Sequence, residues 1–78
     1  MFKSRLPKIL QETLARNGWL PYVSNGRVET FVKRMTTITI VPPSAGGVVS
    51  WQFETVDGSR PAKLGSGVIN SLCDLLDK

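Results

Sequence analysis

The sequence predicts a small α+β domain in the order helix, three strands, helix, with two helices packed on one face of a three-stranded antiparallel sheet. Two amphipathic segments near the ends of the chain and β-prone segments between them carry this prediction. At 78 residues, 41% of them hydrophobic and 21% charged, the chain has room for one core and is too apolar to be disordered. We therefore expect a single domain over residues 1–78.

The first predicted helix covers residues 5–17. Polar residues occupy its outer side, and the apolar positions recur at helical spacing: Leu6, Ile9, Leu10 and Leu14. Ser4 is the expected N-cap, because its hydroxyl can accept a hydrogen bond from a free amide of the first turn. Pro7 is tolerated in that turn, and Asn17-Gly18 supplies the stop.

Two β-prone stretches follow the helix. Residues 19–23 predict a first strand, and Ser-Asn-Gly at 24–26 predicts a hairpin turn. Residues 28–41 contain no glycine or proline, which predicts one long strand, or two joined at a bulge near residues 33–36. If the even-numbered residues of this stretch face the core, Phe31 faces outward with Glu29.

The third predicted strand follows a loop at residues 42–47. Val49, Trp51 and Phe53 alternate with polar residues, so their side of the strand is expected to face both helices. The two tryptophans and Phe53 are accordingly assigned to the core rather than to a stacking surface.

The last helix is expected to begin at a Ser66 cap, after a turn at Asp57-Gly58 and a basic loop at residues 59–64. Its inner stripe consists of Val68, Ile69, Leu72, Cys73 and Leu76. This position favours Cys73 as a small buried hydrophobe over a reactive thiol.

Composition excludes several classes of function. A lone cysteine forms no internal disulfide or cysteine zinc cluster, and this fits a reducing, cytoplasmic compartment. No segment approaches the roughly 20 apolar residues of a membrane span, and no export signal is indicated. No histidine is present, and the six acidic residues show no metal or glycosidase spacing. We therefore expect no catalytic residues, no metal and no cofactor.

One segment suggests a ligand site. Ten Lys and Arg residues against six Asp and Glu give a net charge of +4, which favours acidic partners such as RNA or DNA, although it also suits a solvated surface. The expected start of the last helix offers basic residues and free amides to an anion: Arg60, Lys63, Gly65, Ser66 and Gly67. The alternative is that the glycines only turn the chain and Ser66 only caps the helix. Arg27, Lys33 and Arg34 could extend the basic area.

The element order resembles the double-stranded-RNA-binding-domain fold, including small toxin endonucleases of the HicA type. Residues 14–19, Leu-Ala-Arg-Asn-Gly-Trp, are similar to the helix end and first strand of HicA proteins, and 39–42, Thr-Ile-Val-Pro, to a later strand. A histidine carries the chemistry in that family. Residues 26–29, Gly-Arg-Val-Glu, stand where it would be expected, so the resemblance implies the fold without the nuclease activity.

Two functions remain open. The first is a small basic, non-catalytic module that binds RNA or DNA. The second is a protein-interaction or homodimerising accessory protein, suggested by the small core and by a long strand with an edge available for pairing.

Overall fold

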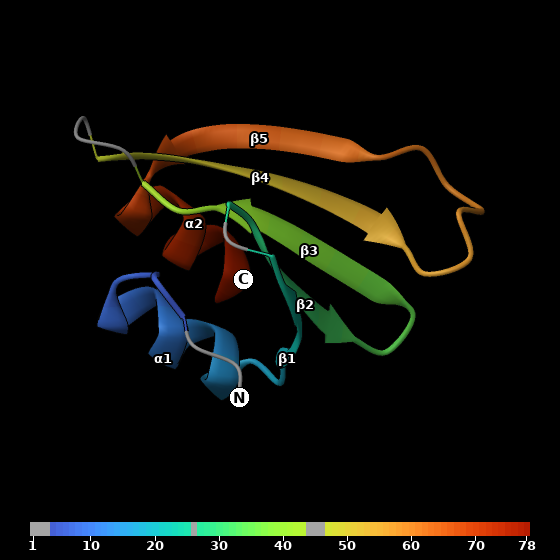
Figure 1. Cartoon of the computed structure of the whole chain (residues 1–78), viewed down its shortest axis with the longest axis horizontal. Coiled ribbons are helices and arrows are strands. Elements are labelled where there is room, and N and C mark those ends of the chain that lie inside the picture. Colours follow the sequence, from blue (N-terminus) through green and yellow to red (C-terminus); the bar gives the residue numbers. More distant parts are fainter. Residues whose placement is uncertain (1–3, 26, 44–46) are drawn as a thin grey trace.

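The computed structural model describes residues 4–25, 27–43 and 47–78 and is an α+β fold of two helices and a five-stranded antiparallel sheet (Figure 1). The elements are α1 (Lys8–Arg16), β1 (Leu20–Ser24), β2 (Glu29–Lys33), β3 (Thr36–Val41), β4 (Val48–Thr55), β5 (Lys63–Val68) and α2 (Ile69–Leu76). The strands lie in chain order across the sheet. The α+β class is confirmed, whereas the expected number of three strands is wrong.

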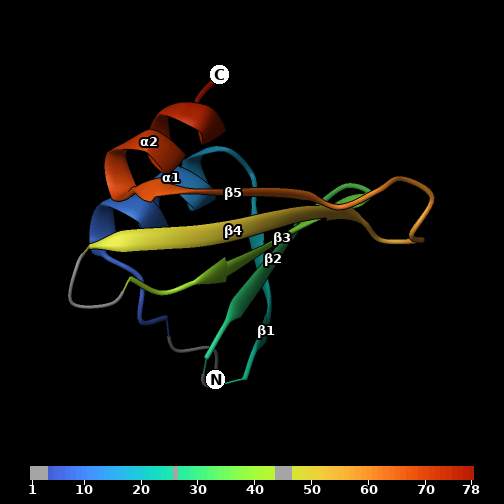
Figure 2. The same ribbon diagram turned by 90° about the horizontal axis from the view of Figure 1, so that it is seen from above.

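Both helices lie on the same face of the sheet, and the hairpin of β4 and β5 projects beyond them (Figures 1 and 2). The core lies between the helices and this face, and its buried apolar residues are Leu6, Leu10, Leu14, Trp19, Phe31, Ile38, Ile40, Val49, Leu72, Cys73 and Leu76. Trp51, Phe53 and Ile69 are partly buried against it. The core assignments of Trp19 and Cys73 are therefore confirmed, and the apolar side of β4 does face the helices.

The predicted long strand is in fact the hairpin of β2 and β3. The chain reverses at Arg34 and Met35, with Arg34 at a φ of 55° and Lys33 paired with Thr36. Partners across a two-residue turn share a face, so the helix-facing positions change from odd numbers in β2 to even numbers in β3. Phe31 is consequently buried, and its expected outward orientation is wrong.

The start of α1 also differs from the prediction. The helix begins at Lys8 after Pro7, with no side-chain cap. Ser4 instead donates its hydroxyl to Glu29 Oε1 at 2.6 Å, and the Arg5 amide donates to Glu29 Oε2 at 2.8 Å. The expected Ser4 cap is therefore wrong, because the hydroxyl bonds to a buried carboxylate on β2. The stop at Gly18, with a φ of 84°, is confirmed.

The segment expected to be a basic loop and a helix start forms strand β5 along most of its length. Ser66 is paired with Ser50 of β4, and α2 begins at Ile69 without a side-chain cap, so the cap at Ser66 is wrong. A Cβ atom at Gly65 would lie 2.7 Å from Trp51 Cζ2. Gly65 is thus required because the Trp51 indole ring packs against its backbone. Glycine inside a strand often marks such a close approach.

Two further predictions concern loops. The β1–β2 turn is confirmed as a hairpin connection, although its Gly26 lies outside the described residues, as do residues 44–46 of the expected 42–47 loop. The turn at Asp57-Gly58 is confirmed, with Gly58 at a φ of 72°.

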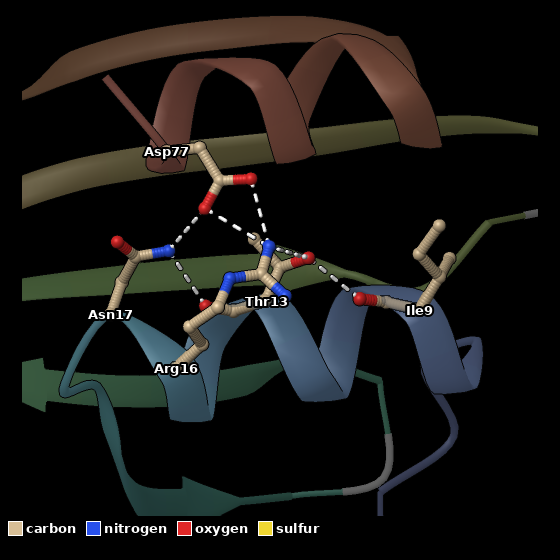
Figure 3. A network of polar contacts seen from close by, with 5 residues as sticks. All are labelled: Ile9, Thr13, Arg16, Asn17 and Asp77. Atoms are coloured by element: carbon tan, nitrogen blue, oxygen red, sulfur yellow. Dashed lines mark hydrogen bonds and ion pairs between the residues drawn. The ribbon is translucent and has the colours of Figure 1, made fainter.

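The C-terminal ends of the two helices are joined by polar contacts (Figure 3). Arg16 Nη2 lies 2.8 Å from Asp77 Oδ2, and Asn17 Nδ2 donates to Asp77 Oδ1 at 2.6 Å. The hydrogen bond from Asn17, and then the Arg16 guanidinium, lower the pKa of Asp77 below its usual value. These contacts join α1 to α2 over the core.

Candidate functional site

The order of the strands brings basic residues from distant parts of the chain to one end of the sheet. In an antiparallel meander, alternate connections lie at the same end, so the β2–β3 turn lies beside the loop between β4 and β5. Lys33, at the end of β2, and Arg34 lie at the first connection, and Arg60 and Lys63, the first residue of β5, lie at the second. We call these four residues the basic end.

Phe53 lies at the centre of the basic end. It pairs with Lys63 in the β4–β5 register and with Ile38 on its other side. Its ring centroid lies 6.1 Å from that of Trp19 at an angle of 55°, and Lys33 Nζ lies 5.9 Å from the Trp19 ring centroid. The Phe53 and Trp19 rings, which we call the aromatic floor, therefore have Lys33 on one side and Lys63 on the other.

Three hollows open around Phe53. The largest, of about 490 Å³, is bordered by Phe53, Trp51, Lys63, Leu64, Gly65 and Leu75. A second, of about 220 Å³, lies towards Lys33, Arg34 and Trp19, and a third, of about 160 Å³, lies towards Arg60 and Lys63. These hollows lie where α2 covers only part of the strands (Figure 1).

The charges of the basic end are uncompensated by ion pairs. Among residues 4–25, 27–43 and 47–78, no carboxylate forms an ion pair with any of these four cations, and the Arg16–Asp77 salt bridge joins the helices instead. Two carboxylates belong to the same end. Glu54 accepts a hydrogen bond from Gln52 at 2.8 Å, and Asp57 accepts one from the Ser59 amide at 3.0 Å. The second of these bonds lowers the pKa of Asp57 below its usual value.

The structure gathers some of the predicted site residues and separates others. Lys33, Arg34, Arg60 and Lys63 meet at the basic end, and Gly65 lines its largest hollow. Ser66 occupies the other face of β5, and Gly67 lies further along the strand towards α2. Arg27 belongs to the β1–β2 connection, at the opposite end of the sheet.

The aromatic part of this site was missed at the level of sequence. Phe53 and Trp51 alternate with polar residues, and this pattern indicates a half-buried strand. It does not indicate which of the apolar side chains on that strand the helices leave uncovered. A five-strand register would have placed Phe53 beside Lys63, but that register depends on recognising residues 63–68 as a strand. Their two glycines favoured a loop instead.

Other kinds of site find no support in the part of the chain that the structure describes. Those residues contain no cluster of three or more His, Cys, Asp or Glu side chains able to hold a metal ion. Within the same ranges, neither helix has the length and apolar character needed to cross a bilayer. Comparisons of the chain with protein-family models, with curated proteins and with solved structures find no match.

Proposed function

We propose that this chain is a non-catalytic nucleic-acid-binding module whose basic end contacts the phosphate backbone. The observation that supports this most directly is the convergence of four cations, from two connections about 30 residues apart in sequence, without a carboxylate paired to any of them. Cations left free of ion pairs are available to replace the counterions that surround a nucleic acid.

The conformation of Arg34 adds support. A non-glycine residue with a φ of 55° costs about 1 kcal/mol or more, and glycine or asparagine would serve this turn at lower cost. Because strain of this kind clusters where a side chain is needed, it favours a role for the Arg34 guanidinium at the tip of the hairpin.

Binding can be tested by fluorescence anisotropy with labelled DNA and RNA oligonucleotides at low salt. Replacing Lys33 and Lys63 together by glutamine should weaken binding about tenfold, because two phosphate contacts are lost. The matched control is Lys8→Gln with Arg27→Gln, which removes the same charge from outside the basic end and should change affinity less than twofold. Equal losses in both double variants, or no binding at low salt, would contradict the proposal.

A second candidate function is self-association, and the unprotected edge of β5 favours it. The other edge strand, β1, carries Pro21 and a bulge between Pro21 and Val23, two devices that discourage strand pairing. In contrast, β5 pairs regularly with β4, contains no proline, and exposes Leu64 and Val68 at 78% and 54%. A second copy of the chain could pair along β5 and cover these side chains.

Sedimentation over a wide concentration range tests the second candidate. If copies pair through β5, Leu64→Lys should shift the protein towards monomer, while Ile9→Lys, at an exposed position of α1, should leave the association unchanged. A monomer at all concentrations would exclude pairing of this kind.

A further inference from the structure

We infer that the basic end selects single-stranded over double-stranded nucleic acid, with a base stacked at Phe53 and the flanking phosphates on the cations. This inference rests on the proposed function. It deepens that function by naming the form of nucleic acid that the charge and aromatic surface around Phe53 would hold.

The first step is the alternation of chemical character across the sheet. Going from β2 to β5, the strands carry Lys33, then Phe53, then Lys63, and the buried Trp19 ring packs between Lys33 and Phe53. Lys33 and Lys63 come from strands three spacings apart, or about 14 Å. A ligand that matches this surface carries negative charge on both sides of a flat apolar group, as a nucleic-acid strand does when its bases are unpaired.

The second step concerns access to the bases. The largest hollow, of about 490 Å³, lies where Leu75 of α2 faces β4 and β5, and Phe53, Trp51 and Leu75 are its apolar walls. In a duplex the bases are stacked on one another and cannot enter such a hollow, so a duplex would contact the cations alone. A single strand can turn a base outward and add stacking to the charge contacts.

The third step is that the floor is available in the folded protein. Phe53 is partly buried against the core rather than enclosed by it, and Leu75, on the neighbouring wall, is 41% exposed. Because Phe53 also borders all three hollows, part of its ring is open to a ligand.

The test compares four probes at the same low salt concentration: an unpaired oligothymidine, an unpaired oligouridine, a DNA duplex of equal length and inorganic polyphosphate. We expect the single strands to bind at least tenfold more tightly than the duplex or the polyphosphate. Phe53→Leu, which keeps an apolar side chain but loses the flat ring, should reduce single-strand affinity about tenfold and leave duplex affinity unchanged.

A second variant keeps the test decisive if Phe53→Leu does not fold. Leu75→Trp fills the mouth of the largest hollow from an exposed helix position, and Ile9→Trp places the same side chain at an exposed position of α1. The first should weaken single-strand binding at least fivefold, and the second should not.

The outcomes separate this inference from the proposed function. Equal affinities for single strand, duplex and polyphosphate, with no effect of Leu75→Trp, would overturn the selection of single strands and leave charge-based binding in place. Absence of binding to all four probes would overturn both.

Discussion

Glu29 is a charged side chain that the structure buries almost completely, at 1% exposure. Its two carboxylate oxygens accept hydrogen bonds from the Ser4 hydroxyl and the Arg5 amide, at 2.6 and 2.8 Å. A buried carboxylate is tolerated when its oxygens are paired in this way. Glu29 therefore holds the segment before α1 against β2.

We expect Glu29→Ala to destabilise the protein by about 2 to 3 kcal/mol, because it removes two hydrogen bonds that tie the segment before α1 to β2 and leaves a gap where a buried side chain was. Urea unfolding followed by tryptophan fluorescence measures the change. Glu12→Ala, at an exposed position of α1, is the control and should change the free energy of unfolding by less than about 0.5 kcal/mol. Equal stability of the two variants would show that the Glu29 contacts contribute nothing.

The two glycines of β5 differ in what surrounds them. A Cβ atom at Gly65 would overlap the Trp51 indole, whereas one at Gly67 would meet Ser71 Cβ at 3.5 Å, an ordinary contact. Gly65→Ala should therefore cost about 1 to 3 kcal/mol through the displaced ring, while Gly67→Ala should be neutral or slightly stabilising. Thermal unfolding of both variants checks this, and a Gly65→Ala protein as stable as the Gly67→Ala protein would contradict the packing argument.

Individual residues show where the sequence was informative. The burial of Cys73 and Leu72 follows from helical spacing alone. Together with Leu76 they form a single apolar stripe along α2, and such a stripe faces the core. The burial of Phe31 could not be found in this way, because it depends on where the chain reverses. A single residue of error in a turn moves a whole strand to the other face.

At the scale of elements, the β2–β3 hairpin escaped prediction because its turn lacks the usual residues. Lys33-Arg34-Met35-Thr36 contains no glycine, asparagine or proline, although Arg34 has a positive φ. Strand β5 was missed for the opposite reason, since its two glycines resemble a loop although the Trp51 ring requires a glycine at position 65. In strand β5 the space needed by an indole ring prevails over local propensity, and in the hairpin the chain reverses although Arg34 must adopt a positive φ.

The contact of Asp77 with Asn17 and Arg16, between the ends of α1 and α2, makes the free energy of unfolding depend on pH in the acidic range. The pKa of Asp77 is lower in the folded protein than its usual 3.8, so the unfolded chain binds the proton more readily. The stabilisation is therefore complete above the usual pKa and is lost as the pH falls through the lowered value. Asp77→Asn should be less stable than the natural protein at pH 7, with the difference shrinking towards pH 3.

Urea unfolding at several pH values measures this difference. Asp74→Asn, at an exposed position of the same helix, is the matched control. A stability gap between the natural protein and Asp77→Asn that stays constant from pH 7 to pH 3 would show that the contact with Arg16 and Asn17 does not favour the ionised carboxyl.

For the molecule as a whole, the sequence singled out the basic residues, with Lys33 and Arg34 as an extension of the site, but did not determine how they are arranged. It grouped Arg60 and Lys63 with the amides of a helix start that lies several residues further along. The sheet instead places them beside Lys33 and Arg34, which are distant in sequence, around Phe53. The pairing of strands distant in sequence determines which basic residues become neighbours, and no local sequence pattern predicts that pairing.

The arrangement makes a quantitative prediction about salt. If a single strand places one phosphate on each of the four cations, the logarithm of the binding constant should fall against the logarithm of salt concentration with a slope of about −3. Replacing Lys33 and Lys63 by glutamine should bring the slope to about −1.4, because two fewer counterions are released. Phe53→Leu should lower the affinity at every salt concentration without altering the slope, since stacking displaces no counterion. Titrations between 20 and 200 mM salt distinguish these cases, and a slope that changes with Phe53→Leu but not with the lysine variants would reverse the roles assigned to ring and cations.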